Sequence, residues 1–194
     1  MTRVTRGAYA RYSCRQMALN GTRTLRGALA GAAGAATWAA QQPLDKRVFG
    51  VEYDDVELLG KLFTRGPAWL PVGLAAHVGN GALFGALYAN VAPSLPGPRA
   101  AWGPLAGLAE CFATWPATLL LDRVHPAAGD FPALWGNPRA LAQATWRHAL
   151  FGFVMGELER RLNPPADSPA PIDDAAVASN GHGSAEHLVT VEPV

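Results

Sequence analysis

The sequence predicts an all-α fold, a polytopic membrane bundle of four transmembrane helices. Only 16% of the 194 residues are charged, against about 25% in an average soluble domain. Long stretches also lack charge: there is no Asp, Glu, Lys or Arg from Gly66 to Pro98, and only Glu110 from Ala100 to Leu121. Because helices of a soluble protein carry charges on their outer faces, these stretches favour a lipid environment.

Four apolar segments have about the 20 residues that a helix needs to cross about 30 Å of hydrocarbon. They are residues 27–44, 69–91, 101–121 and 140–160. Each contains two glycines four residues apart, a spacing that lets a neighbouring helix backbone pack closely. These pairs are Gly27 and Gly31, Gly81 and Gly85, Gly103 and Gly107, and Gly152 and Gly156. A soluble bundle is the alternative, but it would lack enough protein to bury four helices without a polar face.

The first segment follows an arginine-rich stretch and has small residues suited to cleavage at Ala36 to Ala39, so a secretory signal peptide is a rival interpretation. The length of the basic stretch, the weak hydropathy of the segment and an internal repeat favour a membrane span.

That repeat relates the first segment to the third and the second to the fourth. The shared residues are Gly27-Ala-Leu-Ala-Gly31 with Gly103-Pro-Leu-Ala-Gly107, Ala36-Thr37-Trp38 with Ala113-Thr114-Trp115, Leu44-Asp45-Lys46 with Leu121-Asp122-Arg123, and Ala82–Gly85 with Ala149–Gly152. We interpret the pattern as a tandem duplication of a helical hairpin, an arrangement that places a binding site between the repeats in some transporters. Coincidence in an Ala- and Gly-rich chain is the alternative.

Between the first two segments, Tyr53–Thr64 is predicted as a short amphipathic helix, capped by Asp54 or Asp55, on the outer membrane surface or over the end of the bundle. Its predicted apolar face comprises Val56, Leu59, Leu62 and Phe63. The third loop, with Pro126, Pro132 and Pro138, is predicted to be irregular and external.

The domain organisation follows from these segments. Residues 1–23 are a basic cytoplasmic arm, residues 24–162 the transmembrane domain and residues 163–194 a cytoplasmic tail. The tail lacks Phe, Tyr and Trp, which predicts disorder, and its His182 and His187 are weak metal candidates in a solvated stretch.

Basic residues set the predicted orientation, with both termini in the cytoplasm. That side holds Arg3, Arg6, Arg11, Arg15, Arg23, Arg26, Arg99, Arg160 and Arg161. The other side holds Lys46, Arg47, Lys61, Arg65, Arg123 and Arg139, accompanied by many Asp and Glu residues.

Polar residues inside the predicted spans are the candidate site: His77, Asn80, Glu110, Arg147 and His148. A structural interpretation pairs Glu110 with Arg147 across helices, because each charge would otherwise be buried alone. A functional interpretation makes Glu110, with His77 or His148, a proton-accepting cluster. Two further alternatives are haem ligation by the two histidines and simple hydrogen bonding between helices.

Several functions lack sequence support. The net charge of +1 argues against a nucleic-acid partner, and no nucleophile, phosphate-binding or dinucleotide-binding motif indicates an enzyme or a cofactor. The two cysteines, Cys14 and Cys111, are placed too far apart for a disulfide or a metal site. The tryptophans near the span ends, Trp38, Trp69, Trp102 and Trp115, are predicted to anchor the bundle at the membrane interfaces.

The arrangement of these residues resembles the YagU-type bacterial inner-membrane proteins. The resemblance covers about residues 24 to 162, and Tyr53–Thr64 and the tail depart from it. It rests on a Gly-rich first span with a Pro near its end, on His77, Asn80 and Tyr88, on Gly103-Pro-Leu-Ala-Gly107-Leu, and on His148 followed by Glu157-Leu-Glu-Arg160-Arg161-Leu162. It implies a bacterial inner-membrane location and an association with acid tolerance, without a settled molecular activity.

We therefore expect a non-enzymatic inner-membrane protein that moves a proton or small solute, or serves pH homeostasis of the cell envelope. One alternative is a structural subunit that binds a membrane partner, or a second copy of itself, through its glycine stripes. The other is a haem-binding electron carrier.

Overall fold

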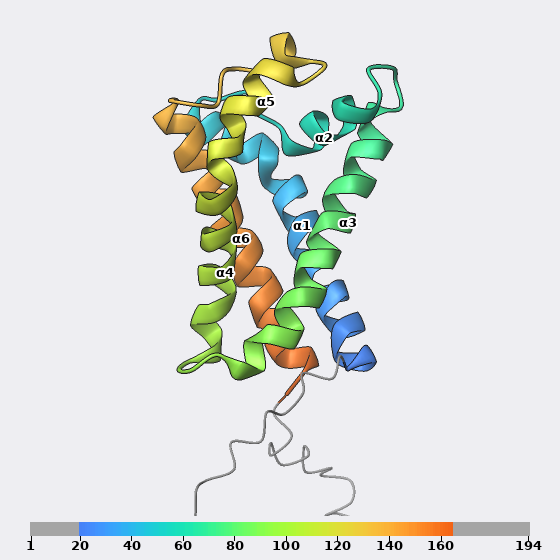
Figure 1. Ribbon diagram of the computed structural model, residues 1–194, viewed down its shortest axis with the longest axis vertical. Coiled ribbons are helices and arrows are strands. Elements are labelled where there is room, and N and C mark those ends of the chain that lie inside the picture. The colour runs from blue at the N-terminus through green and yellow to red at the C-terminus, as the bar shows by residue number, and fades with distance from the viewer. Residues whose placement is uncertain (1–19, 165–194) are drawn as a thin grey trace, which may run out of the picture. The chain divides into compact units, whose positions relative to one another are not determined.

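The computed structural model describes residues 20–164, which are helical and contain no β-strand (Figure 1). The elements in chain order are α1 (Gly21–Phe49), α2 (Asp55–Phe63), α3 (Trp69–Val91), η1 (Ala92–Ser94), α4 (Arg99–Thr114), η2 (Trp115–Ala117), α5 (Thr118–Val124), η3 (Ala128–Asp130) and α6 (Pro138–Leu162). Predictions for the arm before residue 20 and for the tail from residue 165, with Cys14, His182 and His187, lie outside the described residues.

Four long rods, α1, α3, α4 with α5, and α6, lie side by side, and the described chain begins and ends at the same end of this bundle (Figure 1). Two of them, Trp69–Ser94 and Arg99–Val124, are long and apolar enough to cross a membrane. α1 and α6 are as long, but α1 extends past the predicted segment at both ends, from Gly21 to Phe49. The third predicted segment is interrupted by η2, because Pro116 lacks the N–H that a continuous helix requires.

Local sequence explains where the helices begin and end. The side chain of Asn20 accepts a hydrogen bond from the Arg23 N–H at the start of α1, and Asn137 does the same for α6. α1 ends at Gly50, whose φ of 67° lies in the left-handed region that glycine adopts without steric cost. The chain can therefore turn sharply from α1 toward α2.

Glycines join the rods in two close pairs, α1 with α3 and α4 with α6. A Cβ atom on Gly31 would overlap the carbonyl oxygen of Gly81, and one on Gly103 would overlap that of Gly152. All four predicted glycine pairs are buried in this way, so the close backbone packing expected of them is confirmed. The two pairs of helices then meet along α1 and α6, whereas α3 and α4 are not a principal contact.

The helix α2 covers one end of the bundle, as one of the two sequence interpretations expected (Figure 1). Asp54 caps it, and Gly60 packs against the backbone of α3 at Trp69. The predicted apolar face is wrong in part: Val56 is buried, but Leu62 and Phe63 are exposed. Contact with α3 selects a different face from the one that hydrophobic spacing indicates.

The third loop holds α2 in place. The imidazole of His125 donates from Nε2 to the carbonyl oxygen of Leu58 at 3.0 Å, since its Nδ1 accepts from the Ala127 N–H. Lys61 forms an ion pair with Asp130 at 2.8 Å. The hydrogen bonds of this ion pair raise the pKa of Lys61 and lower that of Asp130.

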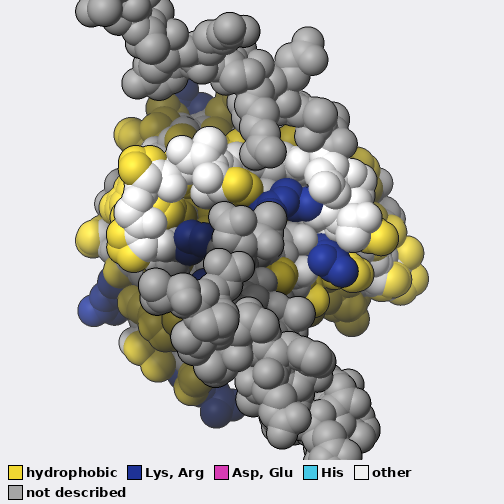
Figure 2. Space-filling model, turned by 90° about the horizontal axis from the view of Figure 1, so that it is seen from below, with side chains coloured by type: hydrophobic (Ala, Val, Ile, Leu, Met, Phe, Trp, Pro, Cys, Tyr) yellow, Lys and Arg dark blue, Asp and Glu magenta, His cyan; other side chains and the backbone are white. Residues whose placement is uncertain are grey.

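At the opposite end, one buried carboxylate joins three rods. Glu159 of α6 is 1% exposed and contacts Arg23 of α1 at 3.5 Å and Arg99 at the start of α4 at 3.0 Å. Arg26 donates to the carbonyl oxygen of Leu162. Figure 2 shows basic side chains at this end, with hydrophobic side chains around the rim.

Candidate functional site

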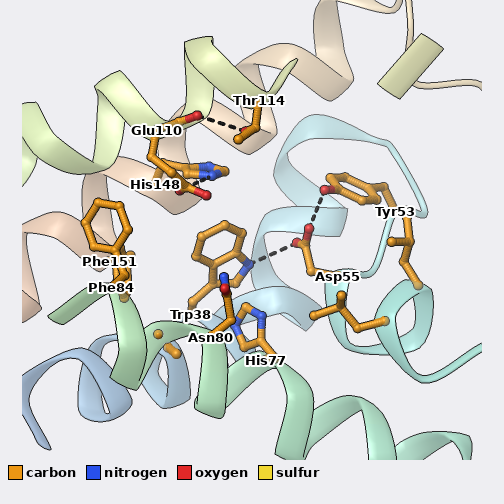
Figure 3. A pocket seen from close by; sticks show the side chains of 14 residues that line it. Trp38, Tyr53, Asp55, His77, Asn80, Phe84, Glu110, Thr114, His148 and Phe151 are labelled. Atoms are coloured by element: carbon orange, nitrogen blue, oxygen red, sulfur yellow. Dashed lines mark hydrogen bonds and ion pairs between the residues drawn. The ribbon is translucent and has the colours of Figure 1, made fainter. Parts of the chain in front are cut away.

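A pocket of about 200 Å³ lies where five helices converge, next to the end covered by α2. Its polar lining combines α1, the entry to α2, α3, α4 and α6, as Figure 3 shows. The lining residues with polar side chains are Trp38, Tyr53, Asp55, His77, Asn80, Glu110, Thr114 and His148. Four of the five residues proposed from the sequence, all but Arg147, therefore line one pocket.

The closest ionisable pair in the pocket is Glu110 with His148. The Nε2 atom of His148 lies 2.9 Å from a carboxylate oxygen of Glu110, and its Nδ1 atom lies 2.7 Å from the carbonyl oxygen of Ala144. Because Ala144 is one turn earlier on α6, the helix itself fixes the orientation of the imidazole. The pair can share and release a proton as one unit.

Arg147 does not pair with Glu110, so that prediction is wrong. Its guanidinium binds Asp45 through two hydrogen bonds of 2.6 and 2.7 Å and Asp55 through one of 2.7 Å. Successive residues on a helix point about 100° apart. His148 therefore faces α4 and Glu110, while Arg147 faces α1 and the entry to α2.

Asp45 is the centre of this second network. It is 2% exposed, accepts from both Arg147 and Gln143, and lies near the end of α1. Gln143 also donates to the carbonyl oxygen of Val51 at 3.2 Å. The network thus ties α6 to α1 and to the chain that follows it.

Asp55 connects the Arg147 network to the pocket. It accepts from the indole N–H of Trp38 at 3.0 Å and from the hydroxyl of Tyr53. Burial and the neighbouring Asp55 carboxylate raise the pKa of Tyr53 well above its ordinary value, so this hydroxyl stays a donor.

Trp38 lies at the centre of the pocket wall and not at a membrane interface, which corrects the prediction that it anchors the bundle there. It is 6% exposed. Its ring packs edge-on against His77, at 5.1 Å between centroids, and against His148, at 4.5 Å (Figure 3). The indole therefore separates the two histidines proposed from the sequence.

His77 contributes a buried nitrogen that is not hydrogen-bonded. The residue is 7% exposed, and its Nε2 atom has no hydrogen-bond partner among the described residues. Asn80, one turn along α3, lines the same pocket. An unsatisfied buried nitrogen is costly, and this atom presents almost no surface to the pocket.

The residues present do not fit a haem. Axial ligation would need His77 and His148 to face each other across the iron, but Trp38 lies between them and both nitrogens of His148 are already engaged. Within residues 20–164, no group of three or more His, Cys, Asp or Glu side chains is arranged to hold a metal ion.

The residues that the sequence reasoning missed are Trp38, Asp45, Tyr53, Asp55 and Gln143. The sequence holds one signal for Asp45. This residue directly follows the first apolar segment, so the long side chain of an Arg inside another segment can reach it. From the sequence alone, the acidic residues after the first segment are expected among the solvated charges outside the membrane.

No protein-family model, curated protein or solved structure matches this chain.

Proposed function

We propose that this chain is a four-span inner-membrane protein that moves a proton, or a small solute carrying one, by way of the pocket containing Glu110 and His148. The observation on which the proposal rests is the carboxylate–imidazole pair in a pocket between the helices of a largely apolar bundle.

The outer surfaces of α1 and α6 support four spans in place of two. Between Arg26 and Arg47 of α1, and between Arg139 and Arg160 of α6, no charged side chain is exposed. Each interval covers about 30 Å of helix, the thickness of the hydrocarbon layer. The exposed residues within them are Leu29, Ala36, Ala40, Pro43 and Leu44 on α1, and Ala142, Trp146 and Phe153 on α6.

These two helices have low mean hydropathy because they contain polar residues. Those residues point inward. Arg147 and Gln143 of α6 and Asp45 of α1 are each at most 2% exposed. These residues lower the mean hydropathy of both helices, although none of them would contact lipid. The arginines of residues 1–26 and Arg99 favour the cytoplasm for the end at which the described chain begins and ends.

An apolar cluster separates the pocket from that end. Phe151 and Phe84 pack ring against ring at 5.6 Å, and Tyr88 and the fully buried Met155 and Ala30 belong to the same cluster. The pocket is therefore closed toward the cytoplasmic end, and movement of a solute requires the cluster to rearrange. The two glycine-packed helix pairs are the rigid parts that could shift relative to each other.

The glycine stripes do not favour the alternative of a subunit that binds its partner through them. Each stripe is covered by another stripe of the same chain, so a partner or a second copy would have to bind elsewhere.

Proton flux into liposomes tests the proposal. Liposomes that contain the purified protein and a trapped pH-sensitive dye are given an acid pulse outside, under a potassium diffusion potential. We expect faster acidification than in protein-free liposomes, and a return to the protein-free rate in Glu110→Gln.

Glu157→Gln is the matched control, because it removes a carboxylate of α6 that pairs with Arg160 and Arg161 at the far end. It should acidify at the wild-type rate. Wild-type protein that does not accelerate acidification, or Glu110→Gln that does so fully, would overturn proton movement through Glu110.

A further inference from the structure

The charged groups around the pocket carry an excess of negative charge. The carboxylates of Asp45, Asp55 and Glu110 are joined to one guanidinium, Arg147, and to one imidazole, His148. Even when the imidazole is counted as positive, one negative charge is left uncompensated. Lys46 does not change this count, because it forms its own pair with Asp54 at 2.8 Å.

This excess favours a cation as the missing partner. An uncompensated charge inside a low-dielectric bundle is strongly unfavourable. A monovalent cation in the pocket would remove that cost, whereas an anion would add to it.

Aromatic rings and pocket size distinguish an organic cation from a metal ion. Trp38, Phe84 and Phe151 line the pocket, with the Trp38 and Phe151 ring centroids 6.3 Å apart. Aromatic faces attract organic cations. A cavity of about 150 Å³ lined by apolar side chains holds a benzene molecule, so about 200 Å³ admits an ammonium group with a small apolar body.

The acceptors that line the pocket favour a cation that donates hydrogen bonds. The side-chain oxygens of Glu110 and Asn80 both accept hydrogen bonds. A protonated primary amine offers three N–H donors, and a quaternary ammonium offers none.

We propose that the pocket binds a small protonated organic amine, whose ammonium group donates to Glu110 and whose apolar part packs against Trp38, Phe84 and Phe151. This inference rests on the proposed function and names the class of solute that carries the proton.

Binding of three related probes to the purified full chain tests the inference by calorimetry at neutral pH. Benzylammonium has charge and donors, benzyltrimethylammonium has charge alone, and benzyl alcohol has neither the charge nor the ammonium donors. We expect benzylammonium to bind about tenfold or more tightly than benzyl alcohol, because hydrogen bonds to charged groups are the stronger ones. Equal affinities would overturn the inference.

Variants assign the contacts. Glu110→Gln should weaken benzylammonium binding about tenfold or more, while Glu157→Gln leaves it unchanged. The wild-type protein should bind benzylammonium more tightly than benzyltrimethylammonium, because only the primary ammonium group donates hydrogen bonds. Equal affinities for these two probes would overturn the donor assignment.

Phe84→Leu keeps every charge, so it tests the binding site even if Glu110→Gln fails to fold. It should weaken benzylammonium and benzyl alcohol alike, because both carry the ring that packs against Phe84, and no loss for either probe would contradict the aromatic contact. Amine binding without proton flux would refute the movement of a proton through the pocket but would leave the amine as the class of ligand. Proton flux without amine binding would refute only the amine.

Discussion

Replacing Arg147 with Met should destabilise the protein more than any other single loss of a charge. The guanidinium is fully buried and donates three hydrogen bonds to the carboxylates of Asp45 and Asp55 and one of 2.9 Å to the carbonyl oxygen of Tyr53. Arg147→Met keeps much of the side-chain volume, so the loss is mainly electrostatic.

The expected magnitude follows from what remains. Asp45 is buried and Asp55 nearly so, and both would lose their cation. Removing one partner of a buried ion pair costs about 3–5 kcal/mol of unfolding free energy, because a charge is left uncompensated. Asp45→Asn in the Arg147→Met background should recover part of that loss, since it removes one of the two stranded charges.

Unfolding in mixed micelles with increasing SDS, followed by circular dichroism, measures these differences. Arg139→Met is the matched control, because Arg139 is exposed in the first turn of the same helix and should cost less than about 1 kcal/mol. The reasoning is refuted if Arg147→Met costs no more than Arg139→Met, or if Arg147 couples energetically to Glu110 and not to Asp45.

Three further outcomes follow from the packing. Gly31→Leu should destabilise by about 1–3 kcal/mol or more in the same unfolding assay because it forces α1 from α3, whereas Gly79→Leu, with open space around its Cβ, should be near neutral. Trp38→Phe keeps a ring between the histidines but loses a hydrogen bond to a carboxylate, so it should cost about 1.5–3 kcal/mol, with a cost below about 0.5 kcal/mol contradicting that bond. The Lys61–Asp130 pair stabilises the loop above the ordinary Asp pKa and is lost as pH falls through the lowered pKa of Asp130, so the protection factors of amides in residues 125–137 should fall below about pH 4. In Asp130→Asn these protection factors should be low at every pH, and a fall below about pH 4 that persists in this variant would exclude the pair as the cause.

The sequence was sufficient to predict helices, glycine contacts and four polar residues of the pocket. Charge-free segments and glycine spacing depend on local composition, and the helices are found where these patterns predict them. His77, Asn80, Glu110 and His148 could be grouped because they occur at similar depths in separate segments. The tandem duplication itself stays a prediction.

The pairing of the charges could not be predicted in the same way. Whether Arg147 or His148 faces Glu110 depends on the rotation of α6 about its axis, which is set by packing against α1 and α4 together. The reach of an Arg side chain also brings Asp45 and Asp55 into the interior, although their sequence neighbours are polar. Trp38 was assigned to an interface from its distance to the segment end, but its position on the inner face of α1 places it in the pocket.

The account depends most directly on four membrane crossings, and cysteine accessibility measures them. In a chain whose two native cysteines are replaced by Ser, single cysteines are placed at exposed positions and labelled with a membrane-impermeant maleimide on intact bacterial spheroplasts. The positions are Thr22, Gly66, Ser94, Gly129 and Arg161, one before or after each long rod. We predict labelling at 66 and 129 in intact cells, and at 22, 94 and 161 only after permeabilisation. Labelling of 94 together with 66, or of 161 together with 129, would contradict the four-span bundle and with it a pocket inside the membrane.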